Sequence, residues 1–523
     1  MREREADREA PLMKSQVERE LKFAVPDSFV IPHLPPAVGM RWTAIEPFEM
    51  TAVYHDTADL RLIRWGVTLR RRWGGSDEGW HLKIPISGAD GLTRQELHLP
   101  LGAGSAGFVP AELADIVTPL TRGERLVPLA TVHTHRSPIN ILDAAGQPRA
   151  EVVDDRVQVL DAEGKVVAEF REVEVEAWDA DRDIDVLAAL ARAITTAGGE
   201  PRSFSKATQA LGPEAAQAPD VPAPVFPGPS GQVADALAAM FRTHVRHLLF
   251  ADMAWRRDLP DAVHQMRVAA RRLRSTLRTF APILNLPSEI DLDEELSWLA
   301  SELGRLRDAE VLADHLLAEL ADVRAVEDPG VGSSEAAALL GAYLENKLDN
   351  ARTGALAATR SDRYTQLLDD LVALAAQPPV PPLGPCAIVL PGLVWAQWRA
   401  LVKAMKQLDA DAPADQWHRV RIKAKRARYA AESVAPIFGN PVQRLAARLA
   451  AITDALGTGQ DAHVAQQLIT ALVAQPDTST AAAFALGHLH AREVTREINA
   501  RADALDAWPP ARKAAKRSRL GEH

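Results

Sequence analysis

Several short segments in the first 210 residues place charged side chains at every second position. In VERELKF, residues 17–23, the carboxylates of Glu18 and Glu20 and the ammonium of Lys22 fall on one face of a β-strand. Each charged face could be solvated, as in many antiparallel sheets. The two signs are instead largely segregated by strand, which favours a closed barrel with its charged faces inward. The same spacing recurs in four later sets: Arg70 and Arg72; His81 and Lys83; Arg94, Glu96 and His98; and Glu172, Glu174 and Glu176.

An interior of this kind indicates phosphate chemistry. Guanidinium groups bind phosphate oxygens through paired N–H donors, and an ammonium binds them as a point charge. Carboxylates at close range repel one another unless a cation neutralises them, so clustered glutamates indicate divalent metal ions. We therefore expect a polyanion and divalent cations inside the barrel.

The elements that must hold these residues change type along the chain. Before residue 212, alternating segments are joined by Gly, Pro and Asp turns, as in a sheet. Residues 212–231 contain six prolines and read as a linker. Long Ala-, Leu- and Arg-rich stretches of helical period follow. The chain is predicted to be an α+β multidomain protein, with a β-barrel domain at 15–211, a helical domain at 232–508 and a basic tail at 509–523 that we expect to be disordered.

The helical region repeats itself. HQMRVAARRLRS from His264 aligns with HRVRIKAKRARY from His418, at a shift of 154 residues. LGRLRDAEVLADHL from Leu303 aligns with LGTGQDAHVAQQLI from Leu456, at a shift of 153 residues. Two matched blocks at nearly one offset predict a duplicated helical unit, with repeats at about 232–376 and 392–508.

Each repeat carries a basic stripe on one helix face. Most charge runs are solvated faces, but these stripes contain no interleaved carboxylate, so like charges repel at i, i+4. This cost favours a polyanion as partner. Nucleic acid is less favoured, because Tyr429 is the one aromatic residue in these blocks that could stack on a base. The stripes comprise His264, Arg267, Arg271, Arg274 and Arg278 in the first repeat, and His418, Arg421, Lys425 and Arg428 in the second.

The first 211 residues resemble the CYTH, or triphosphate tunnel metalloenzyme, family. ERELK fits its ExExK signature, and YHDTADLRLIRWGVTLRRRW, WHLKIP, TRQELHLPL, FREVEVEAW and SFSKATQAL follow in the family's order. The resemblance implies an eight-stranded antiparallel tunnel that binds a triphosphate with Mg²⁺ or Mn²⁺. It implies metal-binding and catalytic roles for Glu18, Glu20, Glu172 and Glu174, a catalytic role for Lys22 as well, and phosphate binding by Lys22, Arg70, Arg72, Lys83, Arg94, Arg136 and Lys206. Glu176, Glu151 and Asp155 share faces with these residues and are further candidates.

The helical region resembles the CHAD domain through VHQMRVAARRLRS, LRDAEVL and WHRVRIKAKRARY. This resemblance implies two pseudo-symmetric four-helix units whose basic surface binds inorganic polyphosphate. Metal binding by the histidines is a known suggestion for the family, but His264 and His418 have no neighbouring ligand in sequence.

These observations predict a metal-dependent inorganic triphosphatase fused to a polyphosphate-binding domain. Two alternatives are a polyphosphate-binding protein with a weakly active tunnel, and an enzyme acting on thiamine triphosphate or ATP, cyclisation included. One cysteine, Cys386, no signal peptide and no long apolar run favour the cytoplasm. Association with polyphosphate granules is a further expectation, which goes with the predicted polyphosphate binding. The formal net charge of −10 excludes a generally basic protein, so the predicted polyanion sites are local.

Overall fold

The computed structural model describes residues 13–32, 40–86, 92–103, 108–161, 163–202, 205–286, 291–326, 331–409 and 412–522. The chain divides into two compact units, Met1–Asp220 and Val221–His523. Each unit has its own secondary-structure type, and each is described separately below.

The N-terminal unit is a closed antiparallel barrel, as predicted. Its ring of eight strands follows the order β1-β6-β5-β4-β3-β7-β8-β9 and closes because β9 pairs with β1. The ring strands are β1 (Lys14–Ala24), β3 (Phe48–Asp56), β4 (Thr68–Trp73), β5 (Gly79–Pro85), β6 (Thr93–Leu99), β7 (Val127–Leu142), β8 (Pro148–Leu160) and β9 (Val166–Ala177). Two short strands add to its edges, β2 (Arg41–Ala44) on β7 and β10 (Glu200–Arg202) on β1.

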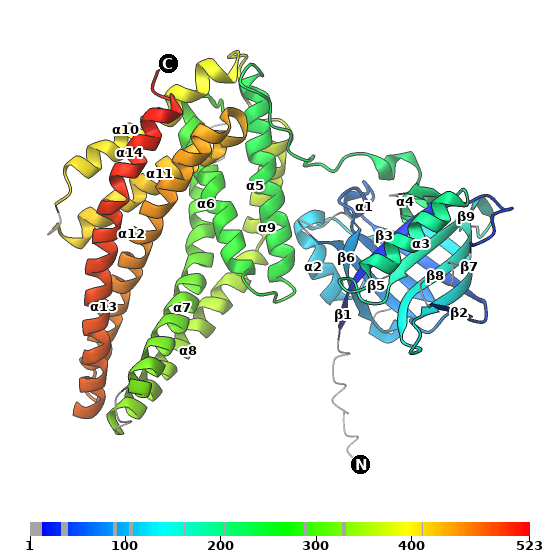
Figure 1. Ribbon diagram of the computed structural model, residues 1–523, viewed down its shortest axis with the longest axis horizontal. Coiled ribbons are helices and arrows are strands. Elements are labelled where there is room, and N and C mark those ends of the chain that lie inside the picture. The colour runs from blue at the N-terminus through cyan, green and yellow to red at the C-terminus, as the bar shows by residue number, and fades with distance from the viewer. Residues whose placement is uncertain are drawn as a thin grey trace. The chain divides into compact units, whose positions relative to one another are not determined.

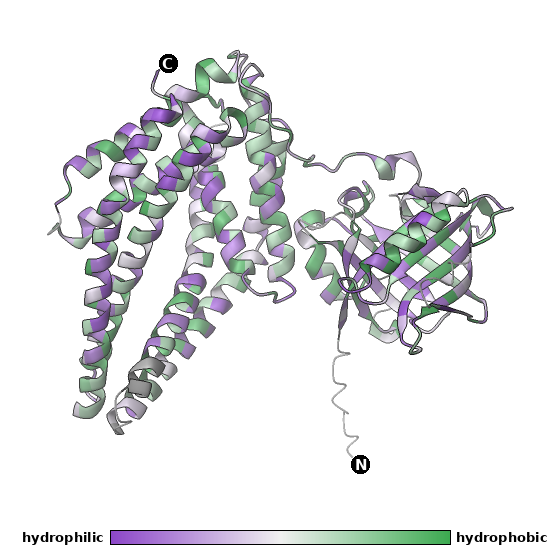
Figure 2. Cartoon of the chain, viewed as in Figure 1, coloured by the Kyte–Doolittle hydropathy of each residue, from purple (hydrophilic) through white to green (hydrophobic). Residues whose placement is uncertain are grey.

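One apolar cluster of this unit lies on the outside of the barrel. Helix α3 (Ile184–Thr196) crosses the outer wall (Figure 1) and buries Leu190 and Ile194 against outward-facing residues such as Val173 and Val175. Strand residues alternate between hydrophilic and hydrophobic, which gives the barrel its striped appearance in Figure 2. The remaining short elements are α1 (Arg61–Arg64), α2 (Ala111–Thr121), α4 (Lys206–Leu211), η2 (Leu101–Ala103) and η3 (Pro213–Ala216). A second apolar cluster contains the inward-facing Ala52, Tyr54, Val132 and Val157, which pack with residues of α1 and α4.

The proline-rich segment predicted as a linker contains the boundary between the units. On the N-terminal side, Asp220 accepts hydrogen bonds from Trp65 Nε1 at 2.8 Å and Arg122 Nη2 at 2.5 Å. On the C-terminal side, Val221 is fully buried and its carbonyl accepts a hydrogen bond from Arg246 at 2.6 Å. Each side of the boundary is therefore fastened to the unit it belongs to.

The C-terminal unit is all-helical and duplicated, again as predicted. In each half of the described chain, four helices pack in chain order and a shorter fifth follows. The first half comprises α5 (Val233–Trp255), α6 (Ala262–Phe280), α7 (Leu292–Val326), α8 (Val331–Thr359) and α9 (Asp362–Ala376), with η4 (Ala281–Ile283) after α6. The second comprises α10 (Cys386–Lys406), α11 (Ala414–Phe438), α12 (Asn440–Val473), α13 (Thr480–Asp506) and α14 (Trp508–Ser518).

The two halves share a hydrophobic core. Leu316 of α7 and Leu340 of α8 pack in one cluster with Leu468 of α12 and Leu486 of α13. No helix in the described part of the chain has an apolar stretch of the length needed to cross a bilayer.

The prediction of a disordered basic tail is wrong. Residues 508–518 form α14, which buries Ala511 and Ala515 and packs on α12, while the Trp508 ring stacks on Trp398 with centroids 5.2 Å apart. The tail is helical because small residues four apart form a narrow buried face. In the order of the repeats α14 is the counterpart of α9, so both halves end in a short fifth helix.

Candidate active site

The interior of the barrel is a polar cavity of about 140 Å³. On β1 the alternation is sharp, since Val17 is 53% exposed on the outer wall whereas Glu18 is 5% exposed inside. Eighteen described residues line the cavity, all with polar side chains, including seven carboxylates and seven cations. Ten were predicted: Glu18, Glu20, Lys22, Arg70, Arg72, Lys83, Arg94, Arg136, Glu174 and Lys206. Eight were not assigned roles: Gln16, Tyr54, Thr68, Asp77, Glu96, Glu151, Glu176 and Ser205.

Strand register explains why opposite charges meet inside. Residues directly opposite each other on antiparallel strands have Cβ atoms about 5 Å apart. The ladders pair a carboxylate with a cation at four places: Glu18 with Arg94, Lys83 with Glu96, Lys22 with Glu174, and Arg136 with Asp155. The closed sheet therefore builds a balanced interior from residues far apart in sequence.

Three carboxylates converge around one lysine at the buried side of the cavity; we call this group the Lys206 cluster. The three carboxylates are Asp155, Glu172 and Glu174, and one oxygen atom of each lies within 4.8 Å of the others. Lys206 is the first residue of α4, positioned by the Ser205 N-cap, whose Oγ accepts a hydrogen bond from the Thr208 N–H. Its Nζ lies 2.5–2.9 Å from an oxygen of each member: Asp155, Glu172 and Glu174.

Further cations hold the Lys206 cluster in place. Arg136 donates to both oxygens of Asp155, at 2.9 and 2.6 Å, and to Glu174 at 3.0 Å. Lys22 donates to Glu174 at 2.7 Å and lies 3.3 Å from Glu20. Burial alone would raise the pKa of Glu174, but the charges of Lys206, Lys22 and Arg136 hold that pKa well below its usual value. The cluster therefore stabilises positive charge and keeps its central carboxylate ionised.

A second group, the Lys83 cluster, consists of Lys83, Glu18, Glu20 and Glu96. Lys83 Nζ lies 2.5 Å from Glu18, 3.7 Å from Glu96 and 4.0 Å from Glu20. Glu96 is also oriented by His81, whose Nδ1 lies 3.0 Å from Glu96 Oε1 and whose Nε2 donates to the Asp77 carbonyl at 2.9 Å. The hydrogen bond from Nε2 fixes the orientation of the His81 ring beside Glu96.

Two carboxyl groups in the cavity titrate near neutral pH. Burial raises the pKa of Glu18 to about 7. Burial, reinforced by the charge of Glu18, raises the pKa of Glu176 to about 8. Burial also acts on Glu20, but Lys22 and Lys83 overcome it and lower the pKa of Glu20 to about 2. Glu18 and Glu176 can therefore exchange protons while Glu20 stays charged.

Three of the four described cavity arginines, all but Arg136, are less fully paired than the lysines. Among the described residues, Arg70 and Arg94 have no carboxylate within 4 Å, and Arg72 contacts only Asp77 at the end of its hairpin. The buried Nε atoms of Arg70 and Arg72 have no hydrogen-bond partner in the described structure. These unsatisfied donors point to an anion as their missing partner.

The four glutamates predicted as one ligand supply fall into two groups. Glu172 and Glu174 join Asp155 in the Lys206 cluster, whereas Glu18 and Glu20 surround Lys83. Among the described residues the Lys206 cluster is the one group of three potential ligands close enough to share an ion. Asp155 was a parity-matched candidate only; its pairing with Arg136 across β7 and β8 is the signal that brings it inward.

In the helical unit, helices α6 and α11 bring the two predicted stripes together. Arg272 of α6 bridges to Glu432 of α11 at 3.0 Å. Burial and neighbouring positive charges lower the pKa values of Arg271 and Arg421, and lower that of Lys425 to about 7. The buried Nε atoms of Arg271 and Arg421 have no hydrogen-bond partner in the described structure. We call Arg271, Arg421 and Lys425 the central basic cluster.

The ends of the stripes are paired instead, mostly with side chains of neighbouring helices. Arg274 and Arg278 both bind Asp293, at 3.1 and 2.6 Å, and Arg267 binds Asp308 at 2.5 Å. In the second stripe, Arg428 binds Glu432 and Asp454, and His418 Nδ1 lies 3.0 Å from Gln460 Oε1. His264 is half-buried, with its pKa lowered by burial, and no group of metal ligands in the described structure contains either histidine.

Comparison with known proteins gives two domain matches and full-length relatives. The CYTH domain matches residues 16–206 and the CHAD domain residues 239–470. Two curated proteins of Mycobacterium tuberculosis, uncharacterized proteins MT2285 and Rv2226, are each 34% identical over 506 residues, or 90% of this chain and 93% of each relative.

Two solved structures resemble parts of the chain. PptA from Streptomyces chartreusis, at 27% identity and a TM-score of 0.47, covers 53% of this chain and 100% of its own. The CHAD domain from the plant Ricinus communis, at 29% identity and a TM-score of 0.44, covers 54% of this chain and 94% of its own. The CYTH match supports an enzyme that acts on triphosphates, of the hydrolase or cyclase type. The chain belongs to the family in which a CYTH domain is followed by a CHAD domain.

Proposed function

We propose that the barrel hydrolyses inorganic tripolyphosphate to diphosphate and phosphate with the help of Mg²⁺ or Mn²⁺. One observation carries this proposal: the cavity that holds arginines without carboxylate partners is also lined by Glu174, one of three converging carboxylates, while the other two, Asp155 and Glu172, lie buried behind its lining. The arginines supply sites for phosphate oxygens, and the carboxylates supply a site for a cation. Phosphoryl transfer requires mainly such positioning and charge neutralisation.

The residues of the Lys206 cluster fit a hard divalent cation. Asp155, Glu172 and Glu174 offer only oxygen ligands, the donor type that Mg²⁺ and Mn²⁺ prefer. The Lys206 ammonium already lies among them, so the cluster is built to hold positive charge. Glu18 and Glu20 are proposed to complete the ligand supply from β1, the strand that pairs with β9. A bound ion would neutralise developing charge on the phosphates and lower the pKa of a water molecule.

The remaining residues of the cavity bind substrate and move protons. Arg70, Arg72 and Arg94 are proposed to bind the triphosphate oxygens, together with Lys22, Lys83, Arg136 and Lys206 once the anion competes for them. Glu176, with a pKa of about 8, is a group at which a proton can be taken from the attacking water or returned to the leaving phosphate.

The lining favours an inorganic over an organic triphosphate. Tyr54 is the one aromatic residue among the described residues that line the cavity. Thiamine and adenine rings need an apolar or stacking surface, and the cavity offers charged groups in its place. An organic triphosphate, with cyclisation of ATP as one case, and a tunnel that only binds polyphosphate are the competing functions.

A substrate panel tests this proposal directly. The purified chain is incubated with tripolyphosphate, thiamine triphosphate or ATP, with Mg²⁺, with Mn²⁺ and with a chelator, and released phosphate and cyclic nucleotide are quantified. We expect metal-dependent phosphate release from tripolyphosphate with the highest kcat/KM. Faster turnover of an organic triphosphate would reject the inorganic assignment, and binding of tripolyphosphate without turnover would favour the binding-only tunnel.

We further propose that the helical unit binds inorganic polyphosphate through the central basic cluster. Burial and neighbouring positive charges lower the pKa values of these three cations, the buried Nε atoms of Arg271 and Arg421 have no hydrogen-bond partner in the described structure, and a polyanion would supply the counter-charge. A linear phosphate chain needs no stacking surface, which favours it over nucleic acid.

Polyphosphate binding is expected to weaken as pH rises from 6 to 8. Lys425, with a pKa of about 7 in the free protein, is mostly charged at pH 6 and mostly neutral at pH 8. An anion binds the charged form, so binding above pH 7 requires proton uptake and costs affinity, about tenfold at pH 8 relative to pH 6. Long-chain polyphosphate, whose few end groups titrate in this range, is the appropriate ligand in a fluorescence or calorimetric titration.

Lys425→Arg provides the matched control for this pH dependence. Arginine keeps its charge throughout the range, so the affinity of this variant should vary much less between pH 6 and pH 8. Equal pH dependence in both proteins would show that Lys425 does not contact the chain.

A further inference from the structure

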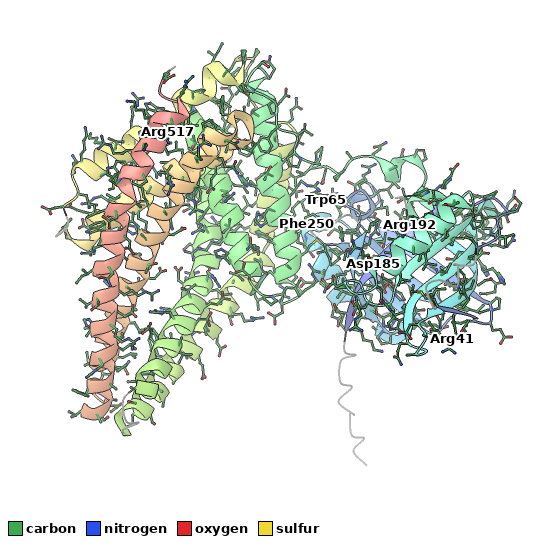
Figure 3. All side chains as sticks on the ribbon, viewed as in Figure 1. Arg41, Trp65, Asp185, Arg192, Phe250 and Arg517 are labelled. Atoms are coloured by element: carbon green, nitrogen blue, oxygen red, sulfur yellow. The ribbon has the colours of Figure 1, made fainter. Side chains whose placement is uncertain are left out.

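The groove between α12 and α14 is a second strongly basic surface in the helical unit; we call it the α12–α14 groove. It has a volume of about 500 Å³ and is lined by cations on both sides, Arg444 and Arg448 from α12 and Lys513 and Arg517 from α14. It shares no lining residue with the central basic cluster. Figure 3 labels Arg517, close to the end of the chain.

None of these cations is neutralised within the described structure. All four side chains are exposed, and none of them lies within 4 Å of a described carboxylate. In each helix the two cations are four residues apart. Each helix therefore presents a short row in which neighbouring cations are spaced about 6 Å apart along the helix axis. Like charges at i, i+4 destabilise a helix unless a carboxylate lies near them. No acidic residue is among the described residues that line the groove.

The helix termini add to the positive field. Pro441 and Pro509, near the first residues of α12 and α14, both line the groove, so the positive ends of two helix dipoles lie beside it. Neither helix has an acidic residue in its first turn, the usual compensation. Arg444, close to the start of α12, therefore carries a further electrostatic cost, whereas Arg517 lies in the last turn of α14, where the dipole favours a cation.

The first repeat shows what a structural version of the same groove looks like. The 153-residue shift places Glu295 of α7 at the position of Arg448. Glu295 forms a bidentate ion pair with Arg363 of α9, at 2.7 and 2.9 Å, and thereby links the two helices. In the second repeat the carboxylate is replaced by a cation and the facing helix is basic as well. The second repeat therefore lacks the internal bridge of the first and carries a row of unneutralised charge in its place.

We propose that the α12–α14 groove binds an inorganic polyphosphate chain, as a site separate from the central basic cluster. The choice of ligand rests on the proposed function of the helical unit. Two parallel rows of cations suit an unbranched anion that carries charge at every unit. No aromatic side chain lines the groove, so an RNA strand would find phosphate contacts there but no ring on which to stack a base.

Stoichiometry tests this proposal on the full chain. A short polyphosphate, too short to span two sites, is titrated calorimetrically into the wild type and three triple variants whose folding is checked by circular dichroism. The groove variant is Arg448→Gln, Lys513→Gln, Arg517→Gln. The central variant is Arg271→Gln, Arg421→Gln, Lys425→Gln. The control variant removes three exposed, unpaired cations of the N-terminal unit, Arg125→Gln, Lys165→Gln and Arg192→Gln, and so changes the net charge equally.

Because the barrel is itself a proposed site for a short polyphosphate, we expect three bound chains for the wild type and the control, and two for the groove variant, with at least about tenfold loss at the missing site. A groove variant that still binds three chains would overturn the inference. A central variant that still binds three chains would contradict the proposed function of the helical unit instead, so the two failures are distinguishable. Preferential binding of single-stranded RNA at the groove, in competition with the short polyphosphate, would likewise overturn the inorganic assignment.

Discussion

Replacing Glu174 with Gln is expected to lower kcat for tripolyphosphate at least about 100-fold with either Mg²⁺ or Mn²⁺. Glu174 belongs to the Lys206 cluster and contacts Lys22, Arg136 and Lys206. The amide keeps the shape but removes the negative charge, so it weakens the cation site and releases three cations from their common partner. Phosphate release at saturating substrate, across a metal titration, measures the effect.

Glu169→Gln is the matched control on the same strand. Glu169 is exposed on the outer wall of β9 and accepts a hydrogen bond from Gln158, so its loss should leave kcat within about twofold. Circular dichroism and thermal unfolding establish whether Glu174→Gln remains folded. A folded Glu174→Gln enzyme with wild-type turnover would exclude the Lys206 cluster from catalysis.

Replacing Arg70 with Gln is expected to lower kcat/KM for tripolyphosphate roughly 100-fold, the loss that follows from removing charge-assisted bonds worth about 3 kcal/mol. Arg70 lies in the cavity without a carboxylate within 4 Å among the described residues, and its buried Nε lacks a partner there. The free-energy cost of burying this unpaired donor is therefore recovered only when an anion enters the cavity. Arg70→Lys should restore only part of the loss, because an ammonium lacks the paired donors of a guanidinium.

The neighbouring Arg71 separates substrate binding from packing. Arg71 lies on the opposite face of β4, over the rings of Trp73 and Trp80. Arg71→Gln should lower thermal stability and leave kcat/KM nearly unchanged. Equal losses of kcat/KM in the Arg70 and Arg71 variants would mean that Arg70 acts through the fold and not on the substrate.

Strand parity was sufficient to predict the barrel and the direction of its charged faces. Alternation fixes which face a side chain occupies, and closure then decides that this face is the interior. Parity does not give the height of a residue along the barrel. Register sets that height: Glu18 is the ladder partner of Arg94, and Glu174 is the ladder partner of Lys22. The four glutamates separate into two groups for the same reason.

Contacts that come from other elements were beyond sequence patterns. Lys206 reaches the carboxylates from a helix outside the ring, and Asp293 neutralises Arg274 and Arg278 from the next helix. Helical spacing identified the basic stripes, but it could not show which of their cations are left without a carboxylate partner and can bind an anion. The same limit produced the error at α14, where a few buried alanines were hidden among basic residues.

The polar interior of the barrel separates two demands that most enzymes place on the same residues. A major apolar cluster of this unit lies on the outer wall, where Val173, Val175 and Leu190 meet, and none of these side chains borders the cavity. Exchanges inside the cavity that preserve its charge balance therefore sacrifice little hydrophobic free energy. Such an architecture can drift among related anionic substrates under selection while its scaffold persists.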